Sequence, residues 1–265
     1  MGNIKFMAKY VRFEYEGHAA YGVLDGDRIG ELRSGLFESL EATGRQFQLN
    51  QVKLLAPCEP KTIFAVGLNY RSHLNGRPEP AKPEIFYKPV ASLQNPGDPI
   101  RIPVQAEDVH FEGEMVVVIG KKMRYVDKDQ AAAGVFGITC GNDVSDRNWQ
   151  RGEDKDNQWW RAKGCDTFAP LGPVIVTDVK YSNLALRTRV NGETLQDQRT
   201  DDLIFDVPTI ISFVSNWVTL FPGDLIYTGT PGNTRRLVPG DVVEVELESI
   251  GVLRNPVSAD KSNGG

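Results

Sequence analysis

The sequence predicts a β-rich α+β fold. Most segments after residue 60 are short, rich in β-branched or aromatic residues, and bounded by Gly, Pro or Asp. Helical periodicity is clear in few places. Strand-like segments do not alternate regularly with long helical ones, which argues against a doubly wound parallel sheet. We therefore expect strands to dominate and helices to be few.

The first 56 residues are expected to form a small N-terminal β domain. The segments "IKFMAKYVRFEYEG" and "AAYGVLDGDRIGEL" alternate as strands do, and Asp25-Gly26 is a hairpin signal. The segment "GLFESLEATG" predicts a short helix ending at Gly44. Residues 54–60, "LLAPCEP", are expected to be a linker.

Residues 57–258 are expected to form one larger domain, followed by a disordered tail over 259–265. Two helices are predicted there. Apolar residues at i, i+1, i+4, i+7 and i+8 predict one over 208–220, and "KDQAAAG" predicts a shorter one after Asp127. The expected strands are "TIFAVGLN", "IFYKPVASL", "EMVVVIG", "VFGITCGND", "GPVIVTD", "LALRTRVNG", "DLIYTGT" and "DVVEVELESIG".

Composition excludes several classes of protein. The 265 residues carry a net charge of −5, and no basic stripe suggests a nucleic-acid partner. No apolar run is long enough to cross a membrane. The three cysteines (Cys58, Cys140 and Cys165) cannot all pair within one chain and lack metal-site spacing, which favours a cytoplasmic location.

Two acids precede a strongly apolar strand in "HFEGEMVVVIG". Residues i and i+2 of a strand share a face, so Glu112 and Glu114 would aim two carboxylates into one space, with Gly113 giving room behind. Two buried like charges need compensation, and a divalent cation would provide it. Solvation of both acids at a strand end is equally compatible with this spacing.

Three further segments add polar groups at strand ends. Asp143 follows the strand-like "GITCGN" and would supply a third carboxylate, although turn capping is a common role for such an Asp. Three carboxylates and few histidines favour Mg²⁺ or Mn²⁺ over zinc. Lys163 could stabilise an oxyanion near a metal, or be an ordinary surface lysine. The turn "TGTPG" offers hydroxyl and backbone N–H groups.

Together these segments resemble the fumarylacetoacetate hydrolase family. The landmarks occur in order from about Thr62 to Val257: "GLNYRSH", "IFYKPVASL", "PGDPI", "FEGEMVVVIG", "GNDVSDRNWQ", "KGCDTFAPLGP", "VNGETLQ" and "FPGDLIYTGTPGN". The resemblance implies a mixed β-roll or β-sandwich core, a homodimer, and Mg²⁺ or Mn²⁺ bound to the enzyme. It also implies a small keto or enol acid as substrate.

The resemblance also implies roles for individual residues. Glu112, Glu114 and Asp143 would be the metal ligands. His73 would activate water from a mobile lid over residues 69–83, and Lys163 would lie near the substrate. Arg147 and Gln150 would be catalytic, and the substrate contacts would be Gly229, Thr230 and Gln196.

The chain departs from the family pattern on the lid. Family hydrolases commonly place a Glu three residues after the lid His, forming a water-activating dyad, and here that position is Gly76. Glu79 could substitute. Asp146 and Asn148 also stand where a small residue and an Asp are more usual. These changes leave the metal ligands intact and affect the hydrolytic step.

From the resemblance, the first expectation is a Mg²⁺-dependent hydrolase that cleaves a C–C bond in an acylpyruvate-type acid. The alternative is an isomerase, tautomerase or decarboxylase of the 2-hydroxyhepta-2,4-diene-1,7-dioate or oxaloacetate type, which the missing lid Glu makes almost equal. A catalytically inactive, metal-binding dimer is a minor alternative. C–C hydrolysis, decarboxylation and isomerisation share the need for a Lewis-acid metal that stabilises a developing enolate.

Overall fold

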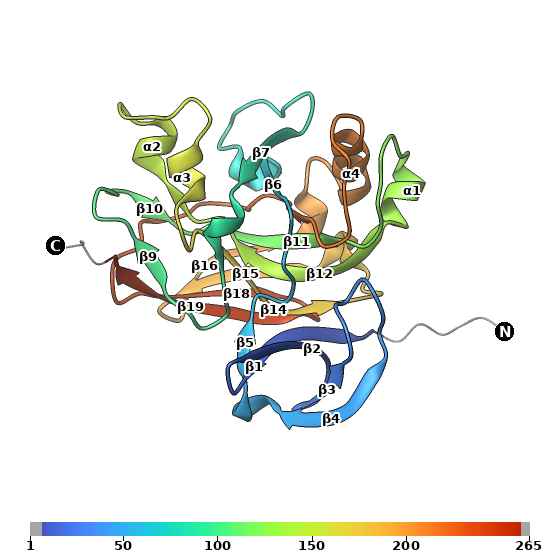
Figure 1. The fold of residues 1–265 in the computed structure, drawn as a ribbon. Helices are drawn as coiled ribbons and strands as arrows, with labels where there is room; N and C mark the ends of the chain where they lie inside the picture. Colours follow the sequence, from blue (N-terminus) through green and yellow to red (C-terminus); the bar gives the residue numbers. More distant parts are fainter. Residues whose placement is uncertain (1–6, 261–265) are drawn as a thin grey trace.

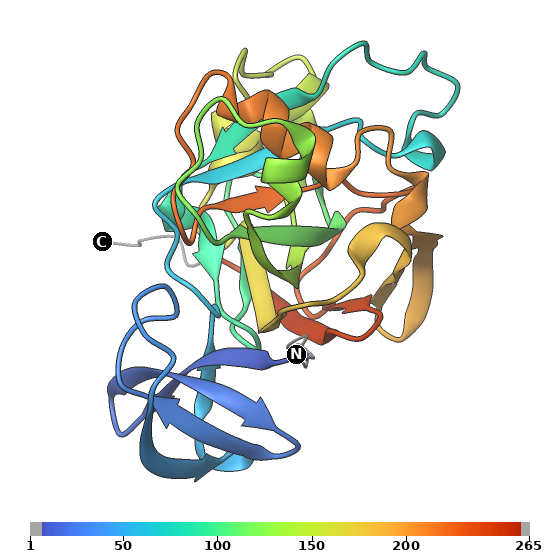
Figure 2. The ribbon, with the colours of Figure 1, turned by 90° about the vertical axis from the view of Figure 1, so that its right-hand side faces the viewer.

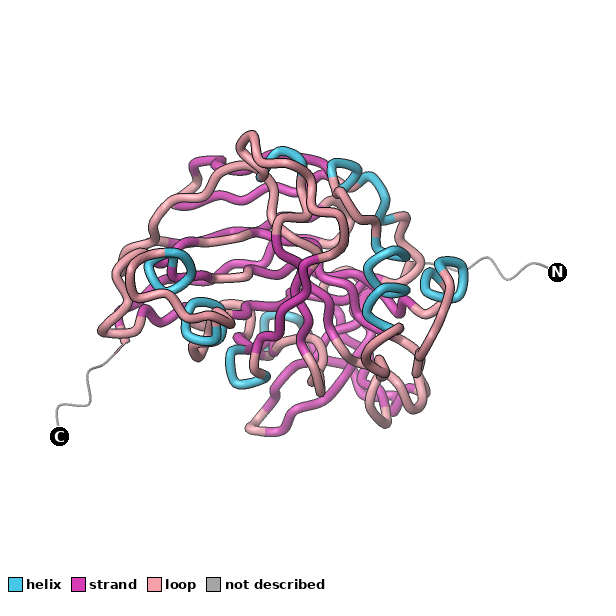
Figure 3. The backbone as a smooth tube through the Cα atoms, turned by 90° about the horizontal axis from the view of Figure 1, so that it is seen from above, coloured by secondary structure: helices cyan, strands magenta, loops and turns pink. Residues whose placement is uncertain are grey.

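The fold is built from strands, as the sequence predicts. A computed structural model describes residues 7–260 of the chain. Within them a 12-stranded sheet, a five-stranded sheet and a two-stranded pair make up the architecture (Figure 1). Seen from above, the helices lie around the margin of the sheets (Figure 3).

The large sheet has the strand order β4-β3-β2-β1-β14-β12-β11-β17-β6-β7, with β5 paired to β1 and β8 paired to β14. Its strands are β1 (Lys9–Tyr15), β2 (His18–Asp25), β3 (Arg28–Leu32), β4 (Ala42–Gln48), β5 (Lys53–Leu55), β6 (Ile63–Gly67), β7 (Glu84–Lys88), β8 (Leu93–Gln94), β11 (Gly113–Ile119), β12 (Val135–Asn142), β14 (Ala169–Val176) and β17 (Leu225–Tyr227).

The smaller sheet has the order β16-β15-β18-β19-β9. Its strands are β9 (Ile100–Ile102), β15 (Ala185–Val190), β16 (Glu193–Arg199), β18 (Val242–Leu247) and β19 (Gly251–Ala259), and β10 (Val109–His110) pairs with β13 (Ser145–Asp146). The helices are α1 (Lys128–Ala132), α2 (Arg147–Arg151), α3 (Trp160–Gly164) and α4 (Val207–Ser215).

Strands β1 to β4 form a lobe below the rest of the molecule (Figures 1 and 2). Two residue pairs between β1 and β14, Lys9 with Val176 and Tyr10 with Ile175, join this lobe to the large sheet. Gly26 and Asp27 form the tight turn between β2 and β3, directly after Asp25, which pairs with Arg28, so the hairpin that Asp25-Gly26 predicts is present.

The helix predicted over "GLFESLEATG" is wrong. A turn occupies residues 36–38, and the chain then enters β4, which pairs with β3. Leu36 is buried, and the ring of Phe37 packs edge-on against Phe136 with centroids 5.1 Å apart. Tertiary packing and an available sheet edge therefore override the weak helical periodicity.

Both predicted helices of the larger domain exist, but one is shorter than expected. Helix α1 begins after Asp127, whose carboxylate accepts from the Gln130 N–H. Helix α4 ends at Ser215 rather than near Leu220, because Leu220 exchanges backbone hydrogen bonds with Met123. Trp217, predicted on the apolar face, is 72% exposed. The sequence did not predict α2 and α3.

The main core lies between the two sheets. Met115, Val117 and Ile119 of β11 pack there together with residues of β15, β18 and β19. Val116 and Val118 face the opposite side, where they meet Ala65 and Tyr227. Both faces of β11 are buried, which explains its unbroken apolar run.

The chain stays ordered up to the end of the described region. Strand β19 extends to Ala259, and the Asp260 N–H donates to the Ile102 carbonyl at 2.8 Å. These two residues therefore do not belong to the expected tail, and residues 261–265 lie outside the described residues. Within residues 7–260, no helix is both long and apolar enough to span a membrane.

Candidate active site

The β11–β12 register brings the predicted carboxylates together. Gly113 pairs with Asn142 and Glu114 with Gly141, so Glu112 and Asp143 lie opposite each other at the strand ends. The Asp143 N–H donates to the Glu112 carbonyl at 2.8 Å. One oxygen from each of Glu112, Glu114 and Asp143 lies within 4.8 Å of the others, and all three residues are buried.

Two glycines beside this cluster leave space for neighbouring side chains. A Cβ at Gly113 would overlap Thr188 Oγ1, and one at Gly141 would overlap both Val116 and Tyr227. The space behind Gly113 that the sequence suggests is therefore filled by a side chain of β15. Close packing around β11 fixes the direction of both glutamates.

Three basic residues compensate the carboxylates. Lys163 Nζ donates to Glu112 Oε2 at 2.5 Å and to Asp143 Oδ2 at 2.6 Å. Lys88 Nζ donates to Asp143 Oδ1 at 2.5 Å and also to the Lys163 carbonyl. Arg147 Nη2 lies 2.5 Å from Glu112 Oε1. Every member of this network is buried, which strengthens each interaction.

The charges shift the pKa values in opposite directions. Burial disfavours the charged form of Glu112, yet Arg147 and Lys163 hold its pKa well below the usual range. Burial likewise opposes the charged form of Lys163, but Asp143 and Glu112 outweigh this effect and raise its pKa. For Lys88, burial dominates and lowers the pKa despite the neighbouring Asp143.

Glu114 is the exception in this network. Its Oε2 accepts from the Gly229 N–H at 2.7 Å, and it has no ion-pair partner among residues 7–260. Burial, followed by repulsion from Asp143 and Glu112, raises its pKa well above the usual range. A divalent cation beside Glu114 would remove this penalty, and the all-oxygen donor set suits Mg²⁺ or Mn²⁺. The residues present therefore fit such an ion.

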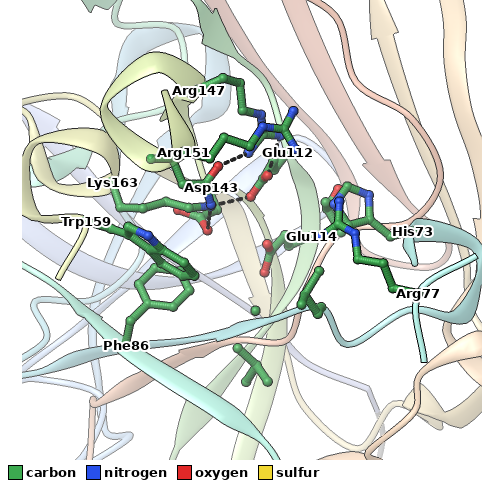
Figure 4. Close-up of a pocket in the computed structure, with 15 residues that line it drawn as sticks. His73, Arg77, Phe86, Glu112, Glu114, Asp143, Arg147, Arg151, Trp159 and Lys163 are labelled. Carbon is green, nitrogen blue, oxygen red and sulfur yellow. Dashed lines mark hydrogen bonds and ion pairs between the residues drawn. The ribbon is translucent and has the colours of Figure 1, made fainter. Parts of the chain in front are cut away.

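A pocket of about 160 Å³ opens onto the carboxylates. Figure 4 shows His73 and Arg77 on one side of them and Lys163, Trp159 and Phe86 on the other. The ring of Phe86 meets that of Trp159 edge-on at 5.5 Å, forming an apolar wall. The predicted site residues that line the pocket are His73, Glu112, Glu114, Asp143, Arg147, Gln150, Lys163 and Thr230.

Two of the predicted substrate contacts lie behind the pocket wall. Gln196 Nε2 donates to Thr230 Oγ1 at 2.9 Å and to the Pro231 carbonyl at 2.5 Å. Gly229 donates to Glu114. Neither Gln196 nor Gly229 lines the pocket. Their polar groups instead hold Thr230 and Glu114 in place. The structure thus shows protein contacts for both residues, and their contact with a substrate stays a prediction.

His73 is oriented by a backbone carbonyl. Its Nδ1 lies 2.5 Å from the Gly232 carbonyl oxygen, which can only accept, so Nδ1 carries a proton. When the ring is neutral, Nε2 therefore holds the free lone pair. No carboxylate hydrogen-bonds to His73 within the described part of the chain.

The loop after His73 places a basic residue in the pocket, whereas family hydrolases commonly carry a Glu on this loop. Asn75 (φ +50°) and Gly76 (φ +83°) form a tight turn, closed by the hydrogen bond from the Arg77 N–H to the Leu74 carbonyl. Arg77 then lines the pocket. Glu79 pairs instead with Arg71 at 3.0 Å and does not line the pocket, so it does not replace the missing lid Glu.

Sequence reasoning missed Lys88, a member of the buried charge network, and several residues that line the pocket. Lys88 lies in the quoted landmark "IFYKP", where a charged residue within an apolar strand is the available signal. Arg77, Arg151, Phe86 and Trp159 carried no such signal. Asp146 has a structural role: its Oδ1 accepts from the Trp149 N–H at 2.9 Å and caps α2.

The mixed-sheet scaffold presents a buried carboxylate cluster that could hold a metal ion. A model of the fumarylacetoacetate (FAA) hydrolase C-terminal family matches residues 62–258, and one named Rv2993c-like, N-terminal matches residues 8–57. The chain therefore belongs to the fumarylacetoacetate hydrolase family and is an enzyme of that family.

Several similar proteins cover most of this chain. Protein Rv2993c of Mycobacterium tuberculosis is 47% identical over 81% of this chain and 82% of its own length. The mitochondrial oxaloacetate tautomerase fahd2 of Xenopus laevis is 39% identical over 83% of this chain and 72% of its own length. The solved 2-hydroxyhepta-2,4-diene-1,7-dioate isomerase of Mycobacterium marinum is 40% identical with a TM-score of 0.89, covering 96% of this chain and all of the other.

Proposed function

We propose that this enzyme catalyses keto–enol tautomerisation, or a related isomerisation, of a small keto or enol dicarboxylic acid. C–C hydrolysis, the first expectation from the sequence, becomes the second choice. The observation that carries the proposal is the hydrogen bond from His73 to the Gly232 carbonyl, with Gly76 and Glu79 giving no acid to activate water. The named activities of the tautomerase and isomerase relatives agree with it.

We propose that Glu112, Glu114 and Asp143 hold Mg²⁺ or Mn²⁺. A bound ion would withdraw electron density from a keto oxygen and so stabilise the charge of an enolate. Lys163 would supply a second cationic contact. Two of its three N–H groups reach Glu112 and Asp143, so one remains to donate to a substrate oxygen. The raised pKa of Lys163 keeps that group charged.

His73 would move the proton on carbon. Its free Nε2 lone pair can accept a proton from the carbon next to a keto group and return it. His73 and Lys163 lie on opposite sides of the carboxylates (Figure 4), so the proton at carbon and the charge at oxygen would be handled by different groups. Phe86 and Trp159 would limit access of water to the enolate.

One substrate separates the candidate reactions. Tautomerisation of oxaloacetate changes the enol absorbance and leaves oxaloacetate intact, decarboxylation yields pyruvate and CO₂, and C–C hydrolysis yields oxalate and acetate. We expect faster relaxation of the enol absorbance with Mg²⁺, loss of this effect with a chelator, and no new product. Formation of oxalate and acetate at the rate of the absorbance change would instead establish hydrolysis.

Two controls keep the assay interpretable. The His73→Gln variant should bind Mg²⁺ normally and lose most of the rate enhancement, roughly 10²–10⁴-fold. Mg²⁺ binding by the unmodified enzyme, with no effect on oxaloacetate, acylpyruvates or 2-hydroxy-diene diacids, would contradict the proposal and favour a binding protein that has lost catalysis.

A further inference from the structure

We infer that Arg77 and Arg151 bind the second carboxylate of the substrate. This inference specifies the substrate class of the proposed function and rests on it for the position of the first carboxylate. Both side chains line the pocket that contains the metal-binding carboxylates. Both residues are exposed, so their guanidinium groups belong to the outer part of that pocket rather than to the buried network.

The two arginines reach the pocket from separate segments. Arg151 is the last residue of α2 and lies four residues after Arg147, so the two project from the same face of that helix. Arg147 is buried against Glu112, which leaves Arg151 further out. Arg77 follows the Asn75-Gly76 turn and lies beside His73 (Figure 4).

Arg77 and Arg151 differ from the other cations of the pocket in having no acidic partner in the described part of the chain. Lys163 is bonded to Glu112 and Asp143, and Arg147 to Glu112. Across residues 7–260, neither Arg77 nor Arg151 forms an ion pair. Arg151 also borders a shallow hollow with Glu107 and Asp108, yet pairs with neither.

The charge balance of the pocket favours a dianion. Four basic side chains (Arg77, Arg147, Arg151 and Lys163) and three acidic ones line it. A divalent ion would add two further positive charges. A keto acid with one carboxylate would bind at the metal site and Lys163, and it would leave Arg77 and Arg151 without a counter-charge. A second carboxylate, which guanidinium groups bind through paired hydrogen bonds, would satisfy them.

A pair of unreactive ligands tests this inference independently of turnover. Malate and 2-hydroxybutanoate are identical except that a methyl group replaces the second carboxylate. Neither is a keto acid, so binding can be measured by calorimetry in Mg²⁺ with no reaction. We expect the unmodified enzyme to bind one enantiomer of malate at least about tenfold more tightly than the matching 2-hydroxybutanoate.

The variants Arg77→Gln and Arg151→Gln should each weaken malate binding by about tenfold and leave 2-hydroxybutanoate within about twofold. Arg28→Gln, which removes an exposed arginine from β3, is the matched control and should change neither affinity. The inference is overturned if the unmodified enzyme shows no preference for malate. It is also overturned if the preference for malate survives when both arginines are replaced by Gln in one protein. Equal weakening of malate and 2-hydroxybutanoate binding in the variants would overturn it as well.

Failure of the proposed function would look different. Discrimination between the two ligands that depends on Arg77 and Arg151, combined with no effect on oxaloacetate tautomerisation, would refute the tautomerase and leave the carboxylate site standing. Tautomerase activity that is unchanged in both variants, combined with no preference for malate, would refute the carboxylate site and leave the tautomerase standing.

Discussion

Glu112 and Asp143 face each other across the ends of β11 and β12, and the Lys163 ammonium group joins them at 2.5 and 2.6 Å. One cation thus compensates two carboxylates contributed by different strands. Glu114, one residue pair further along, lacks such a partner within the described residues. Under the proposed function, a further cation would bind beside Glu114 and remove this asymmetry, which the following predictions test.

Replacing Lys163 by Met should destabilise the metal-free enzyme by about 3 kcal/mol, because two buried carboxylates lose a shared partner. Saturating Mg²⁺ should recover part of that loss by supplying positive charge. Urea unfolding with and without Mg²⁺ measures both effects. Lys155→Met, an exposed lysine, is the control and should change little.

Replacing Glu114 by Gln should separate metal affinity from stability. The variant replaces a buried carboxyl group whose charged form is disfavoured and which has no ion-pair partner among residues 7–260, so the metal-free protein should be at least as stable as the unmodified one. Mg²⁺ affinity should fall at least about 100-fold. Calorimetric titration with Mg²⁺ checks this result against Glu107→Gln, an exposed acid nearby. Unchanged affinity would exclude Glu114 as a ligand.

Replacing Gly113, the glycine between the two glutamates, should destabilise the protein unless Thr188 is also changed. Gly113→Ala places a Cβ on Thr188 Oγ1 and should cost about 2 kcal/mol of unfolding free energy. Thr188→Ala removes the clash, and Thr188 Oγ1 has no hydrogen-bond partner to lose in the described structure. The double variant should recover at least half the loss. Additive losses would contradict this packing.

The turn at Gly76 should resist restoration of the family's acid. Its φ of +83° is unfavourable for a residue with a Cβ, so Gly76→Glu should cost about 1 kcal/mol and produce no oxalate from oxaloacetate. Gly76→Asn is the matched comparison, because Asn tolerates this conformation better. Urea unfolding ranks the two variants, and hydrolysis gained by Gly76→Glu would show that the loop adapts.

Alkaline stability should depend on Cys58. Burial raises the pKa of its thiol from 9.0 to about 12, so above pH 9 only the unfolded chain loses this proton. The stabilising contribution is therefore complete below pH 9 and is lost progressively towards pH 12. Cys58→Val should flatten the pH dependence of unfolding free energy in that window by up to about 1.4 kcal/mol per pH unit. Val11→Ala should leave the slope unchanged.

The sequence predicted individual strands well where local pattern and burial agree. The run "MVVVI" is a strand in isolation and remains one in the sheet. Pattern failed at residues 36–44, where the edge of β3 and the packing of Phe37 decided the conformation. It also failed for α2 and α3, which are too short to show helical periodicity.

The candidate site shows the same division. Glu112, Glu114 and Asp143 could be identified from residue type, strand position and family resemblance, because each stands at the end of an apolar strand. Arg77, Arg151 and Trp159 could not, since they lie in loops or short helices with no recurring pattern. Gln196 looked like a substrate contact, and only the structure shows its side chain behind Thr230.

The sequence by itself determined the β-rich class, the presence of two acids before an apolar strand and the absence of a Glu at position 76. These features follow from side-chain chemistry and short-range periodicity, which any local stretch of chain carries. The residues alone left the grouping of Glu112 and Glu114 with Asp143 open, and it was expected from the family resemblance. Only the tertiary structure decided that Lys88, Arg147 and Lys163 compensate two of the acids and not the third, and that two arginines at the pocket have no ion-pair partner within residues 7–260. Such charge pairing depends on distances between segments far apart in the chain, which no local pattern encodes.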